Sequence, residues 1–267
     1  MKLFLVISIF LSSCVTTIRP STLESFQNTA VELMNLERSG SGSGVIFTSS
    51  EKGSVILTNN HVCEMLLPGG IVINQREEYN IVGIKKSKLH DMCMVMVLEN
   101  LQIDTELASK SPKVHDKVFI SGHPMAYPHI VSEGYISGEQ TIQVNLYSRP
   151  CTASEQNSYP IMCILEGFPV SKAFRSQIVT ALISPGSSGS AVFNARGQII
   201  GLAFAAAGSI GYAAIVPWKY LKQFTETESK TMPWITPNIK YKKKEYSNEG
   251  VYDLENWKKI LKLLEKK

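Results

Sequence analysis

The chain reads TNNHV at residues 58–62, HDMCMV at residues 90–95 and PGSSGS at residues 185–190. Taken one from each motif, His61, Asp91 and Ser188 are the three residue types that an activated serine requires. A serine hydroxyl is a poor nucleophile at neutral pH unless an imidazole takes its proton, and a third group must hold that imidazole in one tautomer. Together the motifs therefore predict a serine that is activated for nucleophilic attack.

The order of these residues along the chain discriminates between catalytic folds. Similar triads run His, Asp, Ser in chymotrypsin-like barrels, Asp, His, Ser in subtilisins and Ser, Asp, His in α/β-hydrolases. All five histidines precede Ser188, which excludes the hydrolase order for this serine. Asp91 is the first aspartate of the chain, so the subtilisin order would require a histidine later than His61. Only the barrel order uses all three motifs.

Several segments around the motifs look like the strands of two barrels, namely residues 41–47, 55–62, 121–124, 134–138, 191–194, 197–201 and 211–217. Over residues 40–224 the chain resembles trypsin-like serine proteases of the chymotrypsin fold, most closely the bacterial HtrA (Deg) type. The resemblance implies an all-β fold. It has two six-stranded antiparallel β-barrels, an active site between them and short terminal helices.

Length and composition fit this architecture, because 267 residues with 44% apolar content can bury one substantial core. We expect four parts: a lipoprotein-type signal peptide at 1–13, a linker and helix at 14–39, the protease domain at 40–225 with its barrel boundary near 110–118, and a basic extension with an amphipathic helix at 226–267. We expect no PDZ domain of the kind that many HtrA-type proteases carry.

Helical periodicity is found mainly at the two ends. It involves Leu23, Phe26, Ala30, Leu33 and Met34 near the N-terminus, and Leu254, Trp257, Leu261 and Leu264 behind a possible cap, Asp253, near the C-terminus. We interpret both as amphipathic helices that pack on the barrels.

The first residues indicate export. Residues 3–11 form an apolar run that is too short to span a bilayer and is typical of a signal peptide. Residues 11–14, LSSC, resemble a bacterial lipobox, which implies lipidation of Cys14 and a membrane-anchored lipoprotein in the periplasm or on the cell surface. The alternative is an ordinary signal peptide in which Cys14 occurs by chance.

Four other cysteines permit disulfides in an exported chain. We favour a bridge between Cys151 and Cys163, which are close in sequence. Cys63 and Cys93 each lie two residues after a proposed catalytic residue, so they could meet behind the active site or remain free buried thiols. The chain has no zinc-like cysteine spacing and no H-E-x-x-H sequence, so we expect no metal or cofactor.

The net charge of +4 is concentrated at the C-terminus, where twelve lysines against seven acids follow from Lys219 onward. This segment could approach anionic lipid head groups, but its mixed signs favour a solvated helix face. No motif supports nucleic-acid binding. The family resemblance implies a protein or peptide substrate, and the lipobox implies a membrane as partner.

The catalytic interpretation assigns a role to each residue. His61 takes the proton of the Ser188 hydroxyl, and Asp91 orients the imidazole and stabilises its cation. The backbone N–H groups of Gly186 and Ser188 form the oxyanion hole. The sequence departs from the family at Ser187 and at Ser190, where Gly is common, and the geometry of this turn is therefore the point to examine.

The resemblance places the pocket for the P1 side chain among Leu182, Ala203, Phe204, Ala205, Tyr212 and Ala213. None of these residues is acidic, which disfavours basic P1 residues and favours a small or medium aliphatic one. Residues 139–178 are longer than expected for the family and are predicted to form a loop or hairpin that shapes access. The predicted function is that of a serine endopeptidase. The alternatives are a catalytically inactive, peptide-binding lipoprotein of the same fold and an esterase.

Overall fold

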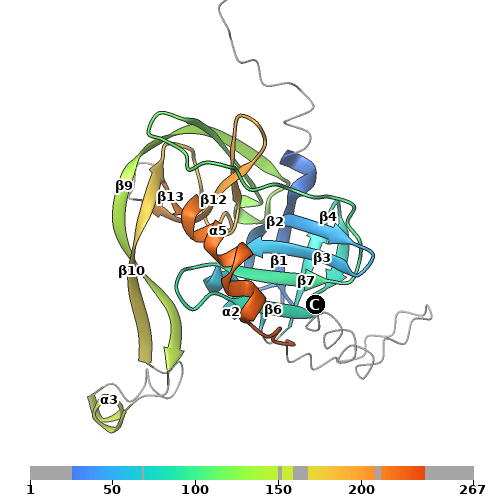
Figure 1. Ribbon diagram of the computed structural model, residues 1–267. Helices are drawn as coiled ribbons and strands as arrows, with labels where there is room; N and C mark the ends of the chain where they lie inside the picture. Colours follow the sequence, from blue (N-terminus) through green and yellow to red (C-terminus); the bar gives the residue numbers. More distant parts are fainter. Residues whose placement is uncertain (1–25, 68, 150–151, 159–167, 208–211, 238–267) are drawn as a thin grey trace, which may run out of the picture.

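The structure is a computed structural model that describes residues 26–67, 69–149, 152–158, 168–207 and 212–237. Strands dominate it, which confirms the all-β prediction (Figure 1). Antiparallel pairing places them in two sheets, one from each half of the chain. The link between the two sheets runs through residues 98–116.

The first half forms a seven-stranded sheet in the order β5-β4-β1-β2-β3-β7-β6. The bounds of its strands are β1 Ala30–Asn35, β2 Ser41–Ser50, β3 Gly53–Thr58, β4 Gly70–Asn74, β5 Glu77–Asn80, β6 Gly83–Lys86 and β7 Cys93–Val97. Helix α2 (Asn60–Leu66) follows β3 directly. The prediction of six strands closed into a barrel is met only in part here, because among the described residues this sheet has seven strands and ends at β5 and β6.

The second half forms a closed barrel of six strands in the order β10-β13-β12-β11-β8-β9, as predicted. Its strands are β8 Lys117–Gly122, β9 Ile130–Arg149, β10 Phe168–Val179, β11 Ala191–Asn194, β12 Ile199–Ala207 and β13 Tyr212–Pro217. The short helices are η1 Pro124–Ala126, α3 Ala153–Ser158, α5 Trp218–Glu226 and η2 Glu228–Thr231.

The helix predicted within residues 14–39 was wrong from Ala30 onward. Of the described residues in this range, which begin at Phe26, only 26–29 are helical, and β1 begins at Ala30. Val31 and Leu33 are fully buried on one face of β1, while Ala30 and Glu32 are buried on the other. The strand pairs with β2 and with β4, so its backbone is bonded along both edges. A segment buried on both faces fits a central strand better than a one-sided helix.

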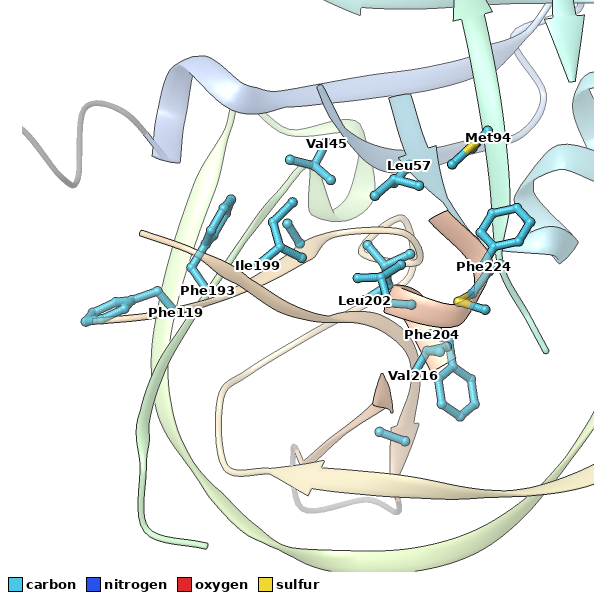
Figure 2. Packing of buried hydrophobic residues seen from close by; sticks show 14 of the residues in the cluster. Val45, Leu57, Met94, Phe119, Phe193, Ile199, Leu202, Phe204, Val216 and Phe224 are labelled. Atoms are coloured by element: carbon cyan, nitrogen blue, oxygen red, sulfur yellow. The ribbon is translucent and has the colours of Figure 1, made fainter. Parts of the chain in front are cut away.

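A shared hydrophobic cluster joins the two sheets (Figure 2). Val45, Leu57 and Met94 from the first sheet pack into the same cluster as Leu202 and Phe204 from β12. Contacts of this kind are dense and rigid, so the cluster fixes the position of one sheet against the other. Any site built from both halves therefore depends on it.

The second barrel carries a long ribbon of β9 and β10, which projects away from the rest of the molecule with α3 near its tip (Figure 1). The two strands remain paired from Ile136 opposite Val179 out to Arg149 opposite Phe168. Residues 139–178 were predicted to form a loop or hairpin, and the hairpin is confirmed.

The C-terminal part of the described chain returns to the first sheet. Helix α5 crosses the molecule (Figure 1), and Ile235 then forms an antiparallel bridge with Ile84 of β6. The helix predicted around residues 253–264 lies outside the described residues. Within the described ranges, no helix has the length and apolar character needed to cross a bilayer.

A disulfide links Cys63 of α2 to Cys93 of β7 (S–S 2.00 Å). This was one of the two states left open for these cysteines, and the bridge is the one observed. The favoured pair Cys151 and Cys163 lies outside the described residues, so that bridge stays a prediction. The observed bridge ties the helix that carries His61 to the strand that follows Asp91.

We expect replacement of both cysteines, Cys63→Ala with Cys93→Ala, to lower the free energy of unfolding by about 3 to 4 kcal/mol, because the bridge closes a loop of about 30 residues in the unfolded chain. Urea unfolding of the oxidised protein and of the double variant measures this. Equal stability of the two proteins would contradict a bridge between these cysteines.

Candidate active site

The imidazole of His61 is bonded to a buried carboxylate. His61 Nδ1 lies 2.7 Å from Asp91 Oδ2, and the His61 backbone N–H donates to Asp91 Oδ1 at 3.0 Å. Asp91 is fully buried, whereas the His61 side chain is 41% exposed. Because a carboxylate only accepts hydrogen bonds, Nδ1 carries the proton and Nε2 is left as a base facing outward. The two residues predicted as base and orienter are therefore brought together.

The loop with Asp91 is fixed by its neighbours. Asn59 precedes α2, yet its side chain makes no cap bond to the helix. Its Nδ2 instead donates to the Asp91 carbonyl at 2.9 Å. Lys86 of β6 pairs with Glu64 of α2. Together with the disulfide, these contacts hold α2 and the Asp91 loop as one unit.

Ser188 lies in the turn of residues 185–190, between Gly186 at φ +90° and Gly189 at φ +88°. A Cβ on Gly189 would lie 2.0 Å from the carbonyl oxygen of Ser43, so this position requires glycine. The Ser188 hydroxyl donates to the carbonyl of Phe204 at 3.4 Å. Among the described residues, no hydrogen bond joins the Ser188 hydroxyl to His61.

Gly42 lets the histidine helix and the serine turn approach each other. A Cβ at this glycine would lie 2.8 Å from Val62 Cγ1 and 3.4 Å from the Ser188 carbonyl oxygen. Val62 is the residue after His61. A side chain at position 42 would therefore push apart the two segments that carry the predicted base and nucleophile.

Two backbone N–H groups of the serine turn have no acceptor among the described residues. The N–H groups of Ser187, Gly189 and Ser190 donate to carbonyls within 2.9 Å, whereas those of Gly186 and Ser188 donate to no acceptor in the described part of the chain. These two groups are the predicted oxyanion donors. An uncompensated pair of donors next to a serine hydroxyl can bind an oxygen that becomes negatively charged.

Ser43 is a buried residue of the first sheet that clamps this turn. Its N–H donates to the Ser188 carbonyl and its Oγ to the Gly186 carbonyl, both at 2.7 Å. The same Oγ accepts from the His123 N–H at 2.8 Å, and the Ser43 carbonyl accepts from Thr58 Oγ1. Sequence reasoning gave Ser43 no role. The available signal was a small polar residue between two glycines at the start of a strand.

The two departures from the family pattern fit the turn. Ser187 Oγ accepts from the Ser184 N–H at 3.2 Å. Ser190 is buried, and its Oγ has no hydrogen-bond partner within the described chain. Space for it exists because residue 122 is glycine, where a Cβ would lie only 1.8 Å from Ser190 Oγ. The turn therefore accommodates both serines.

The residues predicted to line the P1 pocket separate into two groups. Leu182 is 71% exposed and Tyr212 is 36% exposed. Ala203 and Ala213 have no exposed surface, and Phe204 is buried in the cluster between the sheets. The side chain of Ala205 is outside what the structure describes. Leu182 and Tyr212 are thus the predicted members that a substrate can reach without moving the core.

Two further histidines, His123 and His129, are half-buried, and the backbone of His123 lies against Gly186 of the serine turn. His129 Nε2 lies 2.6 Å from Ser121 Oγ, and the His123 and His129 rings meet edge to face at 5.7 Å. Burial lowers the pKa of His123, and burial together with the neighbouring His123 lowers the pKa of His129 to about 4. Both pKa values lie below that of an unfolded histidine, so this pair destabilises the fold as the pH falls from about 6.5 towards 4.

None of the His, Cys, Asp and Glu side chains in the described ranges form a group of three or more that could hold a metal ion. The groups that the structure places at this site are an imidazole, its carboxylate partner, a hydroxyl and two N–H donors without an acceptor among the described residues.

A profile of the family described as "Trypsin-like peptidase domain" matches residues 42–202. The chain belongs to this family. Among curated relatives, the "Serine protease Do-like HtrA" of Lactobacillus helveticus is 26% identical over 176 residues, which are 62% of this chain and 36% of the relative. The "Serine protease HtrA-like" of Staphylococcus aureus (strain USA300) is 28% identical over 172 residues, which are 60% of this chain and 19% of the relative. The resemblance to HtrA-type proteases is confirmed.

Solved structures agree with the fold. The active form of the Rv3671c protease from M. tuberculosis matches with a TM-score of 0.59 and 15% identity, over 78% of this chain and 84% of that one. The serine endoprotease from Yersinia pestis matches with a TM-score of 0.56 and 22% identity, over 77% and 64% of the two chains. The trypsin-like peptidase fold is thereby established. This chain spans only about a third and a fifth of the two curated relatives.

Replacing Ser43 by alanine removes the bond to the Gly186 carbonyl and the acceptor of the His123 N–H. We expect the rate of labelling of Ser188 by a fluorescent fluorophosphonate to fall by about tenfold to a hundredfold, since misplacement of catalytic groups by about 1 Å has effects of this size. Ser41→Ala, on the same strand, is the control and should label like the wild type. Equal labelling rates for Ser43→Ala and Ser41→Ala would contradict a role of Ser43 in positioning the serine turn.

Proposed function

We propose that this protein is a serine endopeptidase that cleaves protein or peptide substrates through a covalent acyl-enzyme. The observation that carries the proposal is the hydrogen bond between the buried Asp91 carboxylate and His61 Nδ1. In the same trypsin-like fold, Ser188 lies in a turn whose Gly186 and Ser188 N–H groups have no acceptor among the described residues. The HtrA-type relatives, which are named serine proteases, support it.

In the proposed mechanism the Ser188 hydroxyl leaves the Phe204 carbonyl when substrate binds and turns to His61 Nε2. His61 takes its proton as Oγ attacks the scissile carbonyl, and the new oxyanion accepts from the N–H groups of Gly186 and Ser188. His61 then protonates the leaving amine. Water repeats the cycle on the acyl-enzyme, which releases the acid and restores Ser188. Asp91 stabilises the imidazolium at each stage.

The inactive, peptide-binding scaffold is the weaker alternative. Such a protein needs no proton acceptor next to its serine and no open pair of N–H donors. Here His61 is bonded to Asp91 as a base requires, two N–H groups of the serine turn have no acceptor among the described residues, and Ser188 is half-buried instead of being sealed in the core. Esterase activity would use the same residues and is tested by the same reagents.

We expect a fluorescent fluorophosphonate to label the mature wild-type protein and not Ser188→Ala. Asp91→Asn should retain the fold and label about 10³ to 10⁴ times more slowly, because it destabilises the reactive histidine tautomer.

Cleavage of a peptide library should favour small or medium aliphatic P1 residues. A folded wild type that is not labelled would contradict the proposal, and dominant basic P1 residues would contradict the pocket assignment.

We also propose that the protein is an exported lipoprotein, anchored to the membrane through a lipidated Cys14. Residues 1–25, on which this rests, lie outside the described residues, so the support is the sequence alone. Expression in a bacterium fed radiolabelled palmitate should label the wild type and not Cys14→Ala. Label retained in the variant would contradict lipidation at this cysteine.

A further inference from the structure

The described C-terminal segment, residues 228–237, crosses from α5 of the second half to the first sheet; we name it the strap. Its end is bonded to β6, since the N–H groups of Ile84 and Ile235 each donate to the other's carbonyl at 2.9 and 2.8 Å. Lys85 Nζ donates to the Ser229 carbonyl at 2.8 Å and lies over the Trp234 ring. The strap therefore follows β6 to the point where the loop towards Asp91 begins.

Glu228, at the start of the strap, is bonded to that loop. Ser87 Oγ lies 2.9 and 3.1 Å from its two carboxylate oxygens, and the Lys88 N–H donates to Oε1 at 2.8 Å. Ser87 is 3% exposed, so this is a shielded contact. Hydrogen bonds to a charged group are stronger than those between neutral groups, particularly away from water.

The Ser87 hydroxyl links Glu228 to Leu89 and His90, the two residues before Asp91. Because its one proton is donated to Glu228, its lone pairs are left to accept, and the N–H groups of Leu89 and His90 both donate to it at 3.2 Å. The loop is closed by the Ser87 N–H on the Met92 carbonyl at 2.9 Å. Asp91 lies between these fixed points.

A second contact from the same C-terminal region reaches the neighbour of Asp91. The ring of Tyr220 on α5 stacks on the His90 ring, with 3.8 Å between centroids. The Tyr220 ring thus contacts the side chain of His90, and Ser87, which is bonded to Glu228, accepts from the His90 backbone N–H. The Phe174 ring of β10 also meets the His90 ring, edge to face at 5.4 Å, so the C-terminal contacts add to those of β10 and α2 in fixing the aspartate loop.

We propose that Glu228 is a positioning residue that, through Ser87, holds the Asp91 loop in the conformation that bonds His61. The inference rests on the proposed function, because it takes Asp91 to be the catalytic aspartate. Glu228 touches neither substrate nor the reacting atoms. Its loss should loosen the Asp91–His61 pair without changing the substrate pocket.

The test compares wild type with Glu228→Ala, Glu228→Gln and, as a matched control, Glu226→Ala. Glu226 lies two residues away and pairs only loosely with Lys222, at 3.9 Å. Proton NMR follows the His61 Nδ1–H signal, assigned by its loss in His61→Gln. Fluorophosphonate labelling gives the rate at Ser188, and peptide cleavage gives kcat and KM separately.

In Glu228→Ala we expect the Nδ1–H signal to shift upfield or broaden, and labelling and kcat to fall by about tenfold to a hundredfold with KM unchanged. Glu228→Gln, whose amide oxygen still accepts from Ser87, should recover most of the rate, and Glu226→Ala should match the wild type. Ser87→Ala should reproduce the loss if Glu228→Ala does not fold.

An unchanged His61 signal and unchanged rates in folded Glu228→Ala and Ser87→Ala would overturn the proposal for Glu228. This outcome differs from failure of the proposed function, in which the wild type itself would neither label nor cleave. The His61 signal in that case still decides the positioning role, because it reports the Asp91–His61 bond without catalysis.

Discussion

The Ser43 N–H donates to the Ser188 carbonyl across the boundary between the two sheets, at 2.7 Å. The bond matters because the proposed base and the proposed nucleophile come from different halves of the chain: His61 and Asp91 lie in the first, and Ser188 lies in the second. Catalysis needs such groups held within about 0.5 Å of their productive geometry. The hydrophobic cluster in Figure 2 sets the coarse distance between the sheets, and Ser43 sets the local position of the serine turn.

The backbone bonding of the same turn accounts for its two unused N–H donors. Three of its N–H groups donate to backbone carbonyls. The other two, those of Gly186 and Ser188, have no acceptor among the described residues and lie next to the Ser188 hydroxyl. Glycines at positions 186 and 189 make this possible, because both backbones adopt positive φ angles. On the other side, a fully buried carboxylate is retained because His61 and its backbone N–H satisfy it. In the proposed mechanism, the Gly186 and Ser188 N–H donors and the Asp91 carboxylate behind His61 are the groups that would act on the carbonyl of a bound substrate.

Sequence alone predicted the family, the all-β class and the chemical pair His61 and Asp91, because short motifs in a fixed order carry that information. It failed at β1, since apolar residues on both faces of a central strand also match a helical spacing over one or two turns. It also missed Ser43 and Glu228. Their roles arise from contacts across 143 and 141 residues of sequence separation, which no local pattern encodes.

In the proposed mechanism Ser188 attacks the substrate carbonyl, and the N–H groups of Gly186 and Ser188 stabilise the oxyanion. A crystal structure of the protein after reaction with a peptidyl phosphonate tests it most directly. We expect a phosphorus bond to Ser188 Oγ, with the phosphonyl oxygen about 2.7 to 3.1 Å from the N–H nitrogens of Gly186 and Ser188. A phosphonyl oxygen pointing away from both N–H groups, or an adduct on another residue, would contradict it.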